Sequence, residues 1–156
     1  MIKLKLAILG LLLFVGSWAH GEGTSTSTNA LPISRKLVLG PSSAPVPGGK
    51  ANLIVGTLTL GSGAYLGDYD MKVSPFFFES EKGKLSITAP PESVEKLIKG
   101  IAVEFTGKAT SSGSGRVRRI DGKTTPSGKD GGMVTLWFVA AGRKMIFTTS
   151  YQFVEK

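Results

Sequence analysis

Alternation of inward and outward positions with a period of two dominates this chain and predicts β-strands. The clearest run covers residues 143–155. Its inward row occupies every second position and consists of Met145, Phe147, Thr149, Tyr151 and Phe153. Side chains two residues apart in a strand lie on the same face of a sheet, so this row is expected to face the core.

Seven further segments share the pattern, with shorter or less regular alternation. They cover residues 35–39, 50–60, 64–73, 84–89, 101–110, 115–121 and 133–141. The last of these is apolar on both faces apart from Thr135, which predicts a central strand covered on both sides. The Pro/Gly/Ser-rich residues 40–49 are expected to form a long connection or an extended segment that lies along the domain.

The run 50–60 contains an interruption. Its inward residues are expected to be Ile54, Leu58 and Leu60. Gly56 breaks this row, and a glycine within a strand often marks a β-bulge. We therefore expect the strand to bend at this glycine.

One segment, residues 90–100, predicts a helix. Prolines stand at its start and Gly100 follows its last turn, as is typical of helix boundaries. Val94, Leu97 and Ile98 form a narrow apolar stripe. A helix this short is marginal alone, so it is expected to dock on a sheet or to close one end of a barrel.

Together these elements predict an all-β, mainly antiparallel domain. It is expected to be a small barrel or a sandwich of about eight strands with one short helix. An α+β domain, built around the strand–helix–strand step of residues 84–109, is the alternative. No internal repeat indicates a solenoid or a propeller.

The N-terminus has the pattern of a secretory signal peptide. Lys3 and Lys5 precede a short apolar run, and the small residues Ser17 and Ala19 follow it with the spacing of a cleavage site. The run is shorter than the roughly 20 residues of a membrane-spanning helix, so we expect cleavage and no membrane span afterwards. We divide the chain into a signal peptide at 1–20, a flexible lead-in at 21–33 and a single β-rich domain at 34–156.

The amino-acid composition limits which cellular compartment and which kinds of catalytic or metal site are compatible with this chain. The 156 residues contain no cysteine and one histidine, His20, beside the predicted cleavage site. An exported protein without disulfides is typical of bacteria, so we expect a periplasmic or secreted protein. Without cysteine or a histidine in the folded domain, Cys/His and Ser/His/Asp nucleophiles and the usual zinc sites are excluded. We expect no metal and no cofactor.

The most basic and glycine-rich segment covers residues 109–132. Arginine pairs on one strand face can hold carboxylate, sulfate or phosphate with parallel hydrogen bonds. We therefore assign an anion site to Arg116, Arg118, Lys108 and Lys123. The alternative is that the arginines keep an exposed edge strand from pairing with another chain. Asp121–Gly122 and residues 126–128 are expected to form turns.

The aromatic residues near the C-terminus have two interpretations. One is a packed core, and the other is the lining of an apolar pocket, as in small barrels that hold one ligand. The residues concerned are Trp137, Phe147, Tyr151 and Phe153. Both interpretations stay open at this point.

Carboxylate chemistry has weaker support. Asp68 and Asp70 lie two apart and therefore share one strand face, opposite Tyr65 and Tyr69. A paired-carboxylate hydrolase needs such groups in a cleft, whereas an exposed strand face accounts for them more simply. Glu81 flanks a loop and carries no motif.

The expected function follows from these points. An excess of 19 basic over 11 acidic residues favours anionic partners, although not nucleic acid, because no aromatic residues alternate with the basic ones. We expect an exported, non-enzymatic β domain that binds a small apolar or anionic ligand or an envelope polysaccharide or lipid. A structural or adhesive envelope protein is the alternative, and a carboxylate-based hydrolase is less favoured.

Overall fold

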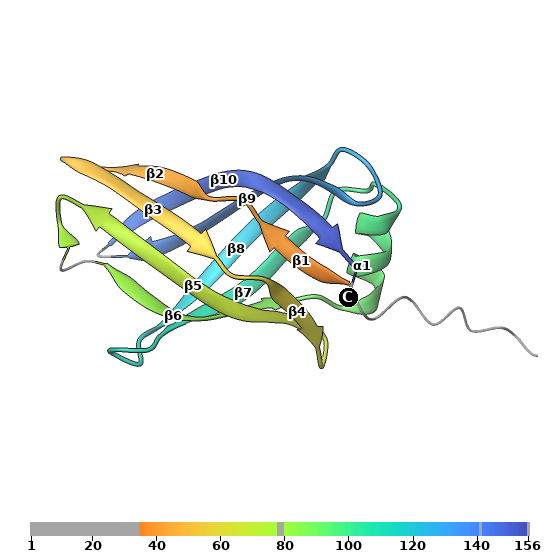
Figure 1. Ribbon diagram of the computed structural model, residues 1–156, viewed down its shortest axis with the longest axis horizontal. Helices are drawn as coiled ribbons and strands as arrows, with labels where there is room; N and C mark the ends of the chain where they lie inside the picture. The colour runs from red at the N-terminus through yellow and green to blue at the C-terminus, as the bar shows by residue number, and fades with distance from the viewer. Residues whose placement is uncertain (1–34, 78–79, 141, 156) are drawn as a thin grey trace, which may run out of the picture.

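The chain folds into a closed antiparallel β-barrel of eight strands with one short helix (Figure 1). The computed structural model describes residues 35–77, 80–140 and 142–155. The predicted all-β fold is confirmed in its barrel form, and the α+β alternative is wrong. The expected signal peptide at 1–20 and lead-in at 21–33 lie outside the described residues.

Ten strand segments make up the eight full-length strands of the barrel wall, which we call staves. They are β1 Lys36–Leu39, β2 Ser42–Val46, β3 Gly49–Val55, β4 Leu58–Gly61, β5 Ala64–Ser74, β6 Glu81–Thr88, β7 Glu104–Ser111, β8 Val117–Pro126, β9 Gly131–Ala140 and β10 Arg143–Val154. Short breaks at residues 40–41 and 56–57 divide two staves, so β1 with β2 and β3 with β4 each act as one.

Each stave pairs with its neighbours in the sequence, and β10 closes the ring against β1. This is the up-and-down arrangement, which allows short connections between antiparallel neighbours. In the β9–β10 connection, Gly142 adopts a φ of 72°, and Ala140 pairs directly with Arg143. The long connection is the one between β6 and β7, which contains α1, Pro91–Ile98.

Helix α1 lies over one end of the barrel (Figure 1). Val94 is buried, and Leu97 and Ile98 pack against the core, as their stripe predicted. We call this the helix end, and we call the opposite end, with the β2–β3, β5–β6, β7–β8 and β9–β10 connections, the mouth end. Within the described residues, no helix is both long and apolar enough to cross a bilayer.

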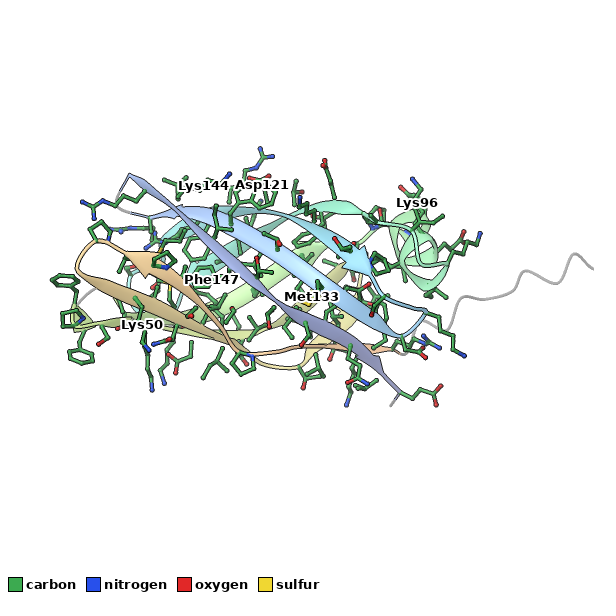
Figure 2. The ribbon with its side chains drawn as sticks, turned by 90° about the horizontal axis from the view of Figure 1, so that it is seen from above. Lys50, Lys96, Asp121, Met133, Lys144 and Phe147 are labelled. Atoms are coloured by element: carbon green, nitrogen blue, oxygen red, sulfur yellow. The ribbon has the colours of Figure 1, made fainter. Side chains whose placement is uncertain are left out.

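Inward-facing side chains of all staves form the core. The row predicted on β10 is buried along its whole length, from Met145 to Phe153. Phe147 lies between the two ends of the barrel (Figure 2) and stacks on Phe138 of β9, with ring centroids 5.6 Å apart. The core interpretation of the aromatic row therefore holds for this residue.

Two predictions about strand faces were wrong. β9 buries Val134, Leu136 and Phe138 on its inner face, whereas Val139 on its outer face is exposed. The strand is not covered on both sides, because the wall of a small barrel has one apolar interior and one outer surface. An apolar outer face alone does not require a second layer.

The second error concerns Ile54, which points outward and is exposed rather than buried. The break at residues 56–57 shifts the alternation by one position. Leu53 and Val55 consequently face inward before the break, and Leu58 faces inward after it. The expected irregularity at Gly56 is therefore confirmed, but the row before it was assigned to the wrong face.

Asp121–Gly122 is not a turn but lies within β8. Gly122 faces inward, and the ring of Phe105 from β7 lies directly over its Cα, where a Cβ would overlap the ring. Glycine is needed at this position for ring packing against the wall, and not for a reversal of the chain. The predicted turn at 126–128 does connect β8 to β9.

The seam between β2 and β10 is closed differently from the other seams. Gly40 donates a backbone hydrogen bond to the Ser150 carbonyl at 2.9 Å, and Thr149 Oγ1 donates to the Pro41 carbonyl at 3.2 Å. In the described wall, no strand ladder continues between β2 and β10 toward the mouth end. Pro45, in β2, lacks the backbone N–H that such a ladder would use.

Candidate functional site

The barrel interior opens at the mouth end into a pocket of about 720 Å³. This volume falls within the roughly 300–1,000 Å³ of ordinary small-molecule sites. Its basic lining residues are Lys82, Arg116, Arg118 and Arg143. Its apolar lining residues are Val46, Met71, Val73 and Met145. Serines of the β7–β8 connection complete the rim.

A buried polar cluster of Tyr69, Glu81 and Arg118 lies where the pocket meets the core. Arg118 Nη2 donates to Glu81 Oε2 at 2.9 Å, and the Tyr69 hydroxyl donates to Glu81 Oε1 at 2.8 Å. The side chains of Arg118 and Glu81 are only 11% and 12% exposed. Both carboxylate oxygens are thus engaged in the barrel interior.

Small residues of the wall make room for this cluster. Gly83 pairs with Tyr69 across β5 and β6, and a Cβ on Gly83 would lie 2.9 Å from Tyr69 Cε1. Arg118 pairs with Ala109 on β7, the stave between β8 and β6. The short side chain of Ala109 leaves space for the arginine to cross β7 and reach Glu81.

The pairing of Arg118 is incomplete. Its Nε is buried and has no hydrogen-bond partner in the described part of the chain. A buried donor without a partner costs about 1–3 kcal/mol, and a buried ion pair also carries a desolvation cost. The cluster is therefore a costly feature of the fold, which is more typical of a functional site than of a stabilising one.

Cations at the rim outnumber carboxylates. Among the described residues, no carboxylate lies within ion-pair distance of Arg116 or Arg143. Lys82 pairs with Asp70 at 3.0 Å on the outer wall. The only carboxylate among the described lining residues is Glu81, so the pocket has a net positive charge.

The structure brings together half of the predicted anion site. Arg116 and Arg118 both line the mouth pocket, as their shared strand face predicted. Lys108 lies on the outer wall, where it pairs with Arg119, and Lys123 lies on the outer wall opposite Glu104. Neither lysine reaches the arginines, because each occupies the outward position of its strand.

The four residues of the predicted aromatic pocket also lie in different places. Phe147 and Phe153 are core residues, and Tyr151 lines a small cavity of about 40 Å³ beneath α1. Such a cavity has room for a water-sized molecule, not for a ligand of ordinary size. Trp137 points outward, with Lys144 Nζ 4.7 Å from its ring centroid, so it does not line the interior.

Asp68 and Asp70, the carboxylates considered for hydrolysis, lie on the outer wall. Asp68 pairs with Lys84 at 2.6 Å, and Asp70 pairs with Lys82. Both pairs join neighbouring positions of β5 and β6, which is a common arrangement on exposed strand faces. In the described residues, no cluster of His, Asp and Glu has the arrangement of a metal site.

Glu81, Tyr69 and Arg143 were missed as site residues, and one sequence pattern indicates the first of them. Leu85 and Ile87 lie two positions apart in the predicted strand 84–89 and are buried on the inner face of β6. Continuing that alternation backward passes through Gly83 and reaches Glu81, a carboxylate on the core face. A charged residue in an inward row usually has a buried partner, which here is Arg118.

The three tyrosines of the chain provide a test of the interior by pH. Burial raises the pKa values of Tyr65, Tyr69 and Tyr151 above their ordinary value of 10.0. For Tyr69, the hydrogen bond to Glu81 and the charge of Glu81 raise the pKa further. The fold therefore favours the neutral phenols, a contribution fully present below pH 10 and lost as pH rises through the raised pKa values.

We expect the absorbance of tyrosinate to appear only above pH 10 and together with loss of the β-sheet circular dichroism signal. Tyr69→Phe is expected to remove one tyrosine from this shared transition. A tyrosine that titrates reversibly near pH 10 in the folded barrel would contradict the burial described here.

Comparison of the chain with protein-family models, with curated proteins and with solved structures found no match. The function of the mouth pocket is therefore argued from its own geometry and chemistry.

Proposed function

We propose that this protein binds a small amphipathic anion in the mouth pocket. The observation that carries the proposal is the pair of rim arginines, Arg116 and Arg143, which line a pocket of about 720 Å³ and have no carboxylate partner among the described residues. Guanidinium groups hold carboxylates, sulfates and phosphates with paired hydrogen bonds. An anion at the rim would supply the missing charge partner.

The apolar lining favours a ligand with an apolar body. Val46 and Val73 come from β2 and β5, and Met71 and Met145 lie deeper on β5 and β10. Unbranched methionine side chains adapt to irregular apolar shapes. Glu81 at the base of the pocket repels a second negative charge, so we propose one anionic head and an uncharged body.

We place this binding function in an exported protein of the bacterial periplasm or exterior, as the N-terminal pattern favours. The proposal includes no chemical step, since Asp68 and Asp70 are paired with lysines on the outer wall. A structural or adhesive envelope protein without a small ligand remains the alternative, and the experiment below distinguishes the two.

The test is a binding titration with decanoate, and with decanol as its uncharged analogue. We expect decanoate to bind and decanol to bind at least about tenfold more weakly, since a hydrogen bond to a charged group contributes about 1.5–3 kcal/mol. Replacing Arg116 and Arg143 together by glutamine is expected to weaken decanoate binding by about 100-fold. The matched control replaces Lys96, in α1, and Lys99, which follows α1, by glutamine at the helix end and is expected to change little.

Three outcomes would count against the proposal. Equal binding of decanoate and decanol would make the pocket a site for neutral apolar ligands. Equal losses in the two double variants would show that net charge, and not the rim arginines, attracts the anion. Failure of both probes to bind would favour the structural alternative.

A further inference from the structure

The outer rim of the mouth end carries a strongly exposed aromatic residue. Phe77, in the connection between β5 and β6, is 73% exposed. Its backbone N–H donates to the Pro75 carbonyl, and its carbonyl accepts from the Ser80 N–H, both at 3.1 Å. Ser80 Oγ in turn accepts from the Val73 N–H at 2.9 Å. The connection therefore holds the ring outward in a defined turn.

Charge is distributed unequally between the two ends of the barrel. We compare charged residues that lie in the connections, beside the chain ends or at the first two or last two positions of a strand. At the mouth end these are the cations Lys50, Lys82, Arg116, Arg118, Arg143 and Lys144 and, among the described residues, the single carboxylate Glu81. At the helix end, the described residues comprise five cations and five carboxylates. Lys50 and Lys96 mark the two ends in Figure 2.

An exposed aromatic ring beside a group of cations is the arrangement that suits an anionic lipid surface. Cations near such a surface each contribute about 1 kcal/mol of attraction, and aromatic side chains favour the boundary between headgroups and acyl chains. A soluble polyanion would use the cations but would gain little from a protruding phenylalanine. The two features together therefore favour a membrane surface over a soluble polyanion.

We infer that the mouth end docks on an anionic membrane surface, with Phe77 inserted among the headgroups and the rim cations beside lipid phosphates. The barrel axis then stands across the surface, with α1 on the far side. This docking goes beyond the proposed ligand binding and needs no ligand in the pocket. If both hold, the pocket opens directly onto the lipids, where amphipathic anions are concentrated.

The experiment is flotation of the exported protein with lipid vesicles. One vesicle set contains phosphatidylcholine alone, and the other contains about one third phosphatidylglycerol, which gives the negative surface potential. We expect binding to the anionic vesicles only, and we expect added salt to weaken it, because salt screens exposed charges.

Paired variants separate docking from general charge attraction. Phe77→Ser is compared with Ile101→Ser, since Ile101 is 50% exposed and follows α1 at the helix end. Lys50→Glu is compared with Lys96→Glu, which changes the same charge at the helix end. We expect each mouth-end variant to bind at least about tenfold more weakly. Phe77→Ser loses the burial of a phenylalanine ring, and Lys50→Glu changes two unit charges at about fivefold each. The helix-end variants are expected to keep near-normal binding.

Several results would overturn the inference. These are equal binding to both vesicle sets, equal losses in the two lysine variants, or unchanged vesicle binding by Phe77→Ser. The last result with the lysine difference intact would mean that charge alone attracts the mouth end to the lipid surface, without insertion of Phe77. Because decanoate binding is measured without vesicles, failure of docking and failure of the proposed function are distinguishable.

Discussion

Phe147→Ala is expected to lower the free energy of unfolding by about 3–5 kcal/mol, the usual cost of removing a buried phenylalanine. Phe147 is 0% exposed, and its ring stacks on Phe138 with an angle of 16° between the ring planes. The closed wall on all sides restricts how far neighbouring side chains can collapse into the space left behind. This limited relaxation places the expected cost in the upper part of that range.

The matched control is Ile146→Ala, one residue away on the same strand. Ile146 points outward and is 49% exposed, so its truncation is expected to change stability by about 0.5 kcal/mol or less. Denaturant unfolding of both variants gives the comparison. If Phe147→Ala were as stable as Ile146→Ala, the aromatic row would belong to an open pocket and not to the core.

The success of the sequence-based fold prediction has a simple physical origin. In a small barrel every stave has one inner and one outer face, so alternation alone assigns the faces of regular staves such as β5 and β10. Irregular staves defeat the same argument. At residues 56–57 a break shifts the alternation, and the parity counted from Leu58 then gives Ile54 the wrong face.

The site was only partly predictable, for a related reason. Alternation along the strand placed Arg116 and Arg118 on one face. The inward row of β8 continues through Ile120, Gly122 and Thr124. Strict use of the alternation would thus have placed Lys123 on the face opposite to Arg116 and Arg118. Distance along the chain was not the obstacle in this case.

Partners across the barrel are different, because no local pattern specifies them. Glu81 and Arg118 are 37 residues apart and belong to staves that are not neighbours in the wall. Ala109 of β7, which pairs with Arg118, has a side chain short enough for the arginine to pass over it toward Glu81. Only the closed wall brings these residues together, so the buried cluster could not be deduced from strand patterns.

The second large effect is expected at this cluster. Glu81→Gln keeps the size of the side chain but leaves the charge of Arg118 without a partner, at a position where the arginine side chain is only 11% exposed. Removing one partner of a buried ion pair costs about 3–5 kcal/mol. The pair adjoins the open pocket, so water can enter, and we expect a loss of about 2–4 kcal/mol in unfolding free energy. Asp68→Asn, which breaks an exposed pair with Lys84, is the matched control and is expected to cost about 0.5 kcal/mol or less.

A second variant keeps this prediction independent of overall damage to the fold. Arg118→Met combined with Glu81→Leu removes both charges and is expected to recover most of the stability, since apolar replacements of a buried pair are often neutral or better. Ligand binding should move in opposite directions in the two variants. Glu81→Gln removes the anion that competes for Arg118 and should strengthen decanoate binding, whereas the double variant loses a guanidinium and should weaken it.

Equal stability losses for Glu81→Gln and Asp68→Asn would mean that the pair is fully solvated. In that case, the Glu81–Arg118 pair would be as accessible to water as the ion pairs on the outer wall, and Arg118 would hold an anion no better than an exposed arginine.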